Sequence, residues 1–271
     1  MTLETLGDAS IVHERRLGIW TIAAAGARLT IIASESRSFE MSSLVSPSGQ
    51  SWIVASTAGT TIDADGRSLA FGSRSDGFRL EEPSTSNDGH TLRLDLPYLV
   101  SAADFRATRH FVVTSGSPTF ETWTTFESIG RAITLADLNA FQFAVPAGTI
   151  HALNGLQGDA ADVTRDTAFT LRTLNPAAGT SVALGAQGRS SEQSVPWLAV
   201  DGAQDEFYAA LMWSGSWSAH IDRSNAGLSL SFGLAPMTTT IQRSRWTGLT
   251  AFLASRPAGC LKPPPRCAPM C

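Results

Sequence analysis

The sequence is nearly free of lysine and has no cysteine up to Gly259. The only lysine is Lys262, and the three cysteines are Cys260, Cys267 and Cys271. A body without cysteine cannot be held together by disulfides, so its stability must come from a buried apolar core. The composition allows such a core, because 43% of the residues are hydrophobic and 16% are charged.

An excess of positive charge is also lacking. The formal net charge is −4 at pH 7, and the isoelectric point is about 5.7. A nucleic-acid-binding protein needs a basic face to displace counterions from phosphates, so we expect no nucleic-acid partner. The histidines are scattered without the spacing of metal ligands, so we expect neither a metal site nor a cofactor. They are His13, His90, His110, His151 and His220.

Long apolar runs are missing. The longest apolar stretch, residues 18–32, is broken by polar residues and is too short to span a bilayer. The first residues, Met-Thr-Leu-Glu-Thr-Leu-Gly-Asp, are acidic and have neither the basic nor the apolar region of an export signal. We therefore expect a soluble, cytoplasmic protein with no membrane partner.

The common catalytic motifs are missing as well: the Gly-x-Ser-x-Gly elbow, the phosphate-binding Gly-x4-Gly-Lys loop and the His-Glu-x-x-His pair. Two carboxylates from distant strands could still form an acid/base pair. Most acidic residues, however, flank turns, where carboxylates accept hydrogen bonds from backbone amides. These turn residues are Asp63, Asp65, Asp76, Asp88, Asp159 and Asp162.

What the sequence does contain is a succession of short strand patterns. Thr91–Leu96 alternates apolar and polar residues with period two, as a half-buried strand does. Phe105–Val113 and Thr119–Ser128 are aromatic and β-branched runs joined by turn residues, which predicts a hairpin. Further strands are expected at Gly18–Thr21, Arg28–Ala33, Ser51–Ala55, Phe141–Val145, Ala168–Leu174, Ser181–Leu184, Trp197–Val200, Glu206–Trp213, Ser216–Asp222 and Leu228–Gly233.

These patterns predict the fold class. No segment keeps helical spacing for a dozen residues, and the nearest, Ile133–Phe143, is short. The chain is therefore predicted to be all-β, a large antiparallel β-sandwich with few or no helices. Because no linker divides the body, residues 1–237 are expected to form one domain and residues 238–271 an irregular tail.

The composition of the tail differs from that of the body, which is rich in arginine, alanine and glycine. Three interpretations remain open. The cysteines could form a zinc or disulfide site, although the spacing Cys-x6-Cys-x3-Cys matches no common ligand pattern. The tail could be native and disordered. We favour a change of reading frame near Ser244 to Trp246, because a shifted frame permits an alanine-rich segment of high helix propensity.

The segment Trp213-Ser-Gly-Ser-Trp217 offers candidate binding residues. If one strand continues across it, both indoles lie on the same face, since four residues is an even spacing. Two indoles on one face can form a platform for sugar C–H groups. They can equally fill the space between two sheets, and Gly215 could form a bulge that redirects one of them. Residue chemistry alone favours the core interpretation.

Several motifs resemble the N-terminal domain of the family 36 α-galactosidases. They are Gly188-Arg-Ser-Ser-Glu192, the pair Pro196-Trp197, the strand running into Trp213-Ser-Gly-Ser-Trp217, and Leu228-Ser-Leu-Ser-Phe-Gly-Leu-Ala-Pro236. Ser216 stands where this family commonly has Asn. Asp76-Gly-Phe-Arg79 is only a loose counterpart of the Gly-Asp-Phe-Arg motif found in many members.

The resemblance implies an N-terminal β-supersandwich, followed in such enzymes by a (β/α)8 barrel that carries both catalytic Asp residues. This chain ends where the barrel would begin, so we assign it no catalytic residue and expect no hydrolysis by the chain alone. If it contacts sugar, the side chains are Trp213, Trp217 and Arg189. The expected partners are an α-galactoside or another carbohydrate, and a second copy of the chain through an exposed barrel-docking face.

Two alternatives from other classes remain at this point. A stand-alone carbohydrate-binding module would use the same tryptophans as its binding face and would bind galactosides without turnover. The chain could also be an unrelated β-sandwich scaffold or adhesion domain, although the missing export signal weighs against an extracellular one.

Overall fold

The computed structural model describes residues 2–55, 57–58, 60–156, 168–236, 238–242 and 245–257. These residues form antiparallel sheets and one short 3-10 helix, Ser101–Ala103. The all-β prediction is confirmed. No helix among these residues has the length and apolar character needed to cross a bilayer. Within the same ranges, no three or more His, Cys, Asp or Glu side chains gather as metal ligands.

The first strands form a six-stranded sheet, which we call the N-terminal sheet. Its strands are β1 (Thr2–Leu6), β2 (Ala9–Glu14), β3 (Ile19–Ala24), β4 (Ala27–Ser34), β5 (Arg37–Val45) and β6 (Thr57–Ala58). Each pairs with the next in sequence, so this sheet is a meander.

An eleven-stranded sheet, the long sheet, runs along the molecule. In spatial order its strands are β10 (Ser84–Asn87), β11 (Thr91–Val100), β12 (Phe105–Thr114), β13 (Thr119–Ser128), β25 (Thr250–Pro257), β20 (Asp205–Met212), β19 (Ser194–Asp201), β16 (Ile150–Asn154) and β17 (Leu171–Leu174). Two short strands complete it: β9 (Phe78–Leu80) pairs with β11, and β24 (Arg245–Thr247) pairs with β13.

The remaining strands form two four-stranded sheets. The β15 sheet has the order β15 (Asn139–Val145), β22 (Gly227–Leu234), β21 (Trp217–Ser224) and β18 (Ser181–Ala186). The β14 sheet has the order β23 (Thr239–Gln242), β14 (Ile133–Ala136), β7 (Thr61–Ala64) and β8 (Arg67–Ala70).

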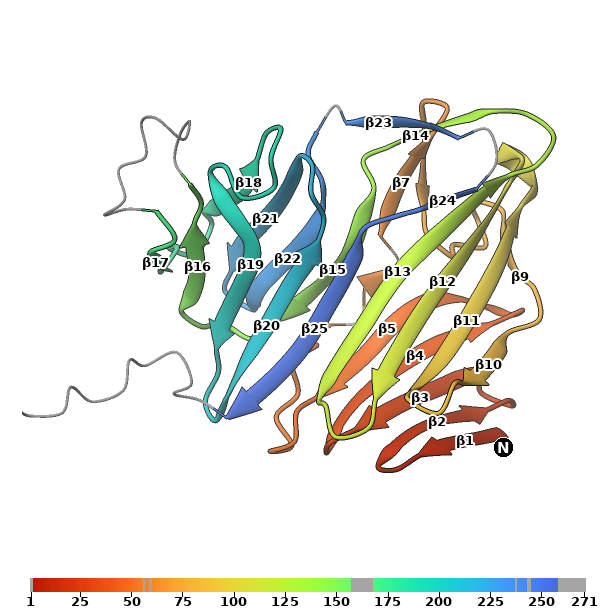
Figure 1. Cartoon of the computed structure of the whole chain (residues 1–271), viewed down its shortest axis with the longest axis horizontal. Helices are drawn as coiled ribbons and strands as arrows, with labels where there is room; N and C mark the ends of the chain where they lie inside the picture. Colours follow the sequence, from red (N-terminus) through yellow and green to blue (C-terminus); the bar gives the residue numbers. More distant parts are fainter. Residues whose placement is uncertain are drawn as a thin grey trace, which may run out of the picture.

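The long sheet is covered on one side by two sheets placed end to end. Figure 1 shows the N-terminal sheet beneath β10 to β13, and β15, β21 and β22 behind β19, β20 and β25. Aromatic ring contacts join the long sheet to both covering sheets. The ring centroids of Phe39 and Phe111 are 6.3 Å apart at the N-terminal sheet, and those of Phe143 and Phe207 are 5.6 Å apart at the β15 sheet. The buried side chains of both halves belong to one continuous core. The architecture is thus an extended sandwich whose long sheet spans two shorter partners.

Alternation of side chains explains why these segments form strands. In β11 every second residue is buried, from Leu92 to Val100, while the residues between are partly exposed. A side chain that becomes fully buried in this way contributes roughly 1.5–3 kcal/mol for Leu or Val. The alternation fixes the strand register, because a shift by one residue would turn the apolar face to water.

Strand β25 occupies the middle of the long sheet. It pairs with β13 on one edge, where Phe120 faces Leu253, and with β20 on the other, where Ala209 faces Leu253. Its buried residues are Ala251, Leu253 and Ser255. Because β25 has partners on both edges, it joins the two halves of the sandwich into one sheet.

The described strands therefore continue beyond residue 237, where we expected the sandwich to end. The alternation in β25 is hard to recognise in the sequence, because two of its three inward residues are small. We expected a change of reading frame near Ser244 to Trp246. Strand β25, which has partners on both edges, comes after that position in the sequence. Ser244, the three cysteines and Lys262 lie outside the described residues.

Most other strand predictions are confirmed, with differences at two places. Residues 51–55 do not form a strand. Ser51 and Ala55 each make one isolated β-bridge, and the side chain of Trp52 between them is fully buried in the core. Ile133–Phe143, whose helical pattern we judged too short, divides into β14 and β15 at Asp137, whose φ is 49°. The strand expected at Ala168–Leu174 is shorter, as β17, and the turn residues Asp159 and Asp162 lie outside the described residues.

The position of β25 generates a prediction about stability. Leu253→Ala removes a side chain that is 1% exposed between two partner strands, and we expect it to lower the free energy of unfolding by about 2–5 kcal/mol. Thr250→Ala, on the partly exposed side of the same strand, should cost about 1 kcal/mol or less. Urea unfolding followed by tryptophan fluorescence measures both. Equal losses would contradict a central position for β25.

Candidate functional site

A hollow lies along β9. A cavity of about 680 Å³ is lined by Glu35, Arg74 and residues 77–81. A second cavity of about 510 Å³ shares Glu35, Leu80 and Glu81 with it and extends to His13 and Arg15 on the N-terminal sheet. We call the two together the β9 groove. Its size suits a small ligand.

Local contacts fix the wall of the groove that contains Asp76-Gly-Phe-Arg79. The Asp76 carboxylate accepts a hydrogen bond from the backbone N–H of Ala70 at 2.7 Å. Phe78 is buried and makes edge contacts with the rings of Phe71 and Tyr98. Gly77, between Asp76 and Phe78, has a φ of +90°, a conformation that favours glycine. Arg79 is consequently left exposed at the groove.

Charged side chains line the same groove. Arg106 Nε donates to Glu81 Oε2 at 2.6 Å, and this bond holds the pKa of Glu81 below its ordinary value. Arg74 Nη1 donates to the backbone oxygen of Ser36 at 3.1 Å, which ties the groove to the N-terminal sheet. Carboxylates and guanidinium groups side by side can both accept from and donate to the hydroxyls of a polar ligand.

The predicted contact residues lie elsewhere: Arg189 between β18 and β19, Trp213 between β20 and β21, and Trp217 at the start of β21. Figure 1 shows these strands on the opposite side of the molecule from β9. The structure brings the two motifs of this region together: Trp217 Nε1 donates to the backbone oxygen of Ser190 at 2.6 Å, and the Gly188 N–H donates to Ser216 Oγ at 2.8 Å. We call residues 188–192 and 213–217 together the Trp213 loop.

Within the Trp213 loop the predicted residues differ in exposure. Trp217 is 1% exposed and stacks on Phe232 with ring centroids 5.8 Å apart, so its indole supports the core. Trp213 is partly buried, and its Nε1 donates to the backbone oxygen of Ser216 at 3.2 Å. The side chain of Arg189 is 60% exposed and pairs with Glu192 at 2.7 Å. Of the three, Trp213 and Arg189 present surface to solvent.

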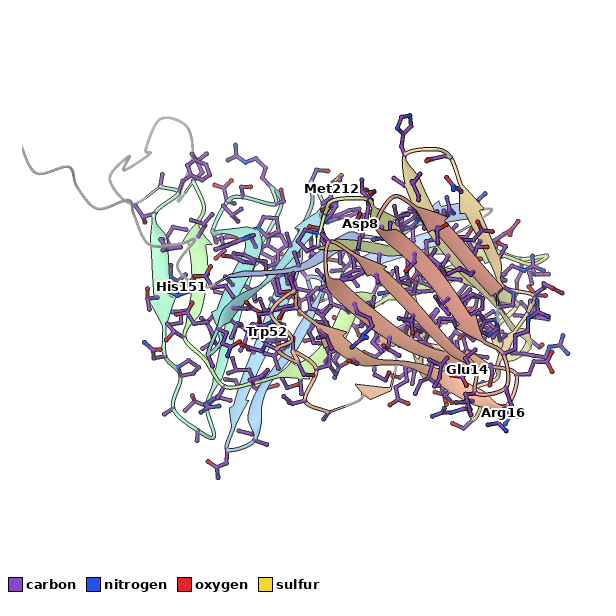
Figure 2. All side chains as sticks on the ribbon, turned by 90° about the horizontal axis from the view of Figure 1, so that it is seen from below. Asp8, Glu14, Arg16, Trp52, His151 and Met212 are labelled. Atoms are coloured by element: carbon purple, nitrogen blue, oxygen red, sulfur yellow. The ribbon has the colours of Figure 1, made fainter. Side chains whose placement is uncertain are left out.

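The side of the long sheet that faces away from both covering sheets carries aromatic side chains that remain partly exposed. We call this side the open face and define it by Trp123, Trp197, Phe252 and Met212; Met212 is 62% exposed. In Figure 2, Trp52 lies among the packed interior side chains, and His151 of β16 lies at the opposite end from Glu14 and Arg16. The open face therefore carries partly exposed aromatic side chains together with polar ones, and aromatic side chains of this kind are common at interaction surfaces.

A polar cluster is embedded in the open face. His110 Nδ1 lies 2.7 Å from Asp95 Oδ1, and His110 Nε2 lies 2.9 Å from Thr125 Oγ1. Nδ1 also lies 2.9 Å from Arg93 Nη2, which can only donate, so the tautomer of His110 decides which of the two neighbours Nδ1 bonds. Arg93 Nε donates to Asp95 at 2.6 Å, and its guanidinium lies 5.3 Å from the Trp123 ring centroid.

Burial dominates the protonation of His110. It lowers the pKa of this histidine more than neighbouring Asp95 raises it, so the ring is held neutral. Burial alone would raise the pKa of Asp95, but hydrogen bonds from His110 and Arg93 outweigh it and hold that pKa below its usual value. Thr125 is 5% exposed, so its hydroxyl is not presented to a substrate. The cluster therefore ties three strands together rather than forming an accessible nucleophile.

Sequence reasoning missed both the β9 groove and the His110 cluster. Asp95 and Thr125 contact His110 from adjacent strands, each fifteen positions away in the sequence. Only the strand register brings them together. The signal available was the period-two alternation, which places Arg93 and Asp95 on the polar side of their strand.

Comparison with known proteins supports the fold. No protein-family model matches the sequence, and no curated protein matches it significantly. The GH36 α-galactosidase AgaB from Geobacillus stearothermophilus superimposes with a TM-score of 0.69 at 12% identity, covering 91% of this chain and 41% of that one. The α-galactosidase from Lactobacillus brevis gives 0.68 at 11% identity, covering 92% and 41%.

A third solved structure, the α-N-acetylgalactosaminidase NagBb from Bifidobacterium bifidum, gives a TM-score of 0.53 at 9% identity, covering 95% of this chain and 36% of that one. The chain thus has the fold of one part of a larger glycosidase. More specifically, its described residues share the fold of part of the GH36 α-galactosidases, and the resemblance seen in the sequence is confirmed at the level of fold. The chain spans about two fifths of the length of those enzymes.

The neutral state of His110 generates a pH prediction. A histidine whose pKa is lower in the folded state than its ordinary 6.5 contributes stability that is complete above pH 6.5 and is lost as the pH falls below it. Uptake of one proton on unfolding changes the free energy of unfolding by at most about 1.4 kcal/mol per pH unit. Burial also lowers the pKa of His13, so both histidines contribute in this window.

We therefore expect His110→Gln to flatten the decline in unfolding free energy between pH 6.5 and pH 4.5. The exposed His220 on β21 provides a matched control, and His220→Gln should leave the decline unchanged. Urea unfolding at a series of pH values measures both variants. An unaltered slope in His110→Gln would show that this histidine is not held neutral.

Proposed function

We propose that these residues form the N-terminal, non-catalytic domain of an α-galactosidase-like glycoside hydrolase, in which a (β/α)8 barrel outside these residues carries the chemistry. One observation carries the proposal: the Geobacillus α-galactosidase covers 91% of this chain, whereas this chain covers only 41% of that enzyme. Hydrolysis of terminal α-galactosides is then the activity of the complete enzyme. We keep the cytoplasmic location predicted above as part of the proposal.

The open face supports a docking role. Its aromatic side chains belong to a sheet whose other side is covered, and they remain partly exposed. Covering them would stabilise a complex by about 25 cal/mol for each Å² of apolar surface removed from water. The occupant we propose is a catalytic barrel domain. Where no barrel is present, a second copy of this chain would cover the same surface.

The Trp213 loop supports a minor role in contacting sugar. Arg189 can donate hydrogen bonds to hydroxyls, and the partly exposed Trp213 offers an aromatic face to C–H groups. Trp217 acts through its hydrogen bond to Ser190, which holds the loop in place. The same surface favours the second candidate function, a carbohydrate-binding module that works without a barrel.

A single experiment separates the two functions. Structural relatives have been crystallised with raffinose and stachyose, which makes raffinose a reasonable probe. We expect the purified chain to release no galactose from raffinose and to show no saturable binding in calorimetry. Release of galactose that stays proportional to the chain through successive purification steps would refute the non-catalytic role.

Saturable raffinose binding without turnover would favour the carbohydrate-binding module instead. In that case Trp213→Ala and Arg189→Ala should each weaken binding about tenfold or more, corresponding to about 1.4 kcal/mol. Trp246→Ala provides the control, because Trp246 is also partly exposed but packs on Phe126 in another part of the molecule.

The open face generates a prediction about self-association. We expect the purified chain to dimerise or aggregate as its concentration rises, and the double variant Trp197→Ser/Phe252→Ser to do so less. Leu3→Ser is the matched control, since Leu3 is 53% exposed but lies on β1. Sedimentation velocity over a concentration series measures all three proteins. A wild-type chain that stays monomeric at high concentration would contradict a docking role for this face.

A further inference from the structure

The long sheet has a free edge at β9 (Figure 1). Strand β9 pairs with β11, where Leu80 faces Tyr98, and its other edge has no partner strand among the described residues. Farther along, β10 pairs with the same edge of β11, but there the N-terminal sheet approaches: Asn87 Nδ2 donates to the backbone oxygen of Thr5 at 3.3 Å. The open part of the edge is therefore β9 and the residues just after it.

The backbone of Leu80 points toward this open edge. The N–H of Glu81 donates to the backbone oxygen of Pro97 on β11 at 2.8 Å. Hydrogen-bonded and non-hydrogen-bonded pairs alternate along an antiparallel ladder, so the N–H and C=O of Leu80 point away from β11. In the part of the chain that the structure describes, neither group has a backbone partner. Leu80 thus offers one donor and one acceptor at the edge.

The β9 groove follows this edge. Consecutive residues, 77–81, line its larger cavity of about 680 Å³, and residues 80–83 line the second cavity. Side chains of a strand alternate between its two faces, so a cavity above one face would be lined by every second residue. Because consecutive residues line the groove, it runs beside the backbone. Glu35, from the turn between β4 and β5, lines both cavities.

The charges along the groove differ between its two cavities. Arg74 and Arg79 line the larger cavity, and Glu82 lines the second. Glu81 lines both, but its carboxylate is already bonded to Arg106. An acidic side chain is therefore attracted to the position of Arg79, and a basic one to the position of Glu82, three residues farther along the chain.

We propose that the β9 groove binds an extended peptide segment of another protein, which joins the long sheet as an antiparallel strand beside β9. Such strand addition satisfies the free backbone groups of Leu80, and opposite charges across an antiparallel pair are stabilising. In antiparallel order, the residue facing Glu82 comes three positions before the residue facing Arg79. The preferred segment therefore has Lys or Arg, two further residues, and then Asp or Glu.

The position of the edge favours a single peptide over a second copy of this chain. His13 and Arg15 of the N-terminal sheet region also line the groove, so the edge is recessed and two such edges cannot meet. Charged residues and a proline beside an edge strand can serve only to prevent aggregation, but that role needs no groove. The inference does not depend on the proposed glycosidase role, and the raffinose experiment does not bear on it.

A synthetic heptapeptide, acetyl-Ser-Lys-Thr-Val-Glu-Thr-Ser-amide, is the probe, with its valine facing Leu80. We expect the purified chain to bind it with a dissociation constant below about 1 mM, measured by fluorescence anisotropy of a labelled peptide. The matched control is the same peptide N-methylated at valine, which lacks the N–H that bonds Leu80. It should bind about tenfold more weakly. Equal binding of both peptides, or binding of neither, would overturn the proposal.

Charge reversal in the chain locates the site. Arg79→Glu should weaken binding of the probe about tenfold, and a peptide with lysine in place of its glutamate should recover the loss in that variant. Arg67 on β8 is likewise exposed, and Arg67→Glu should leave binding unchanged. In NMR spectra of the wild-type chain, the Leu80 amide resonance should shift on binding. Binding that ignores Arg79→Glu, or shifts confined to other strands, would refute a site at β9.

Discussion

The pairing of β25 on both of its edges is the constraint on which the rest of the structure depends. Without it, β20 and the first part of β13 would have unpaired backbone groups at a sheet edge, and the two halves of the sandwich would have no common strand. The core continuity follows from this pairing, because Leu253 packs in the same layer as Phe120 and Ala209. The open face follows as well, since one uninterrupted sheet presents one uninterrupted outer side.

Two of the buried polar side chains, Arg109 and His110, connect neighbouring strands or sheets. Arg109 donates to the backbone oxygen of Ala140 at an irregularity in the β15 sheet, and His110 links Asp95 to Thr125 across three strands. These two residues are neighbours in the sequence and point to opposite sides of β12. Apolar packing alone does not specify which strand lies beside which, and buried polar contacts with a single set of partners reduce that ambiguity.

The sequence predicts the strands better than it predicts the site. Period-two alternation in residues 91–96 and the aromatic hairpin after it are local signals, and both segments are strands. The β9 groove and the His110 cluster depend on which strands pair, which no local pattern encodes. Trp217 shows the difference: its even spacing from Trp213 is visible in the sequence, but only the packing against Phe232 shows that its ring is covered.

The order of strands in the long sheet has a consequence for synthesis. β13 ends at Ser128, yet the two strands that cover its free edge, β24 and β25, begin only at Arg245 and Thr250. While the intervening residues are being made, β11, β12 and β13 can form a sheet whose last edge remains open. Closing that edge joins residues far apart in sequence, which is intrinsically slow. The nascent chain therefore passes through a stage when an unpaired, aggregation-prone edge is exposed, and chaperones would be most needed then.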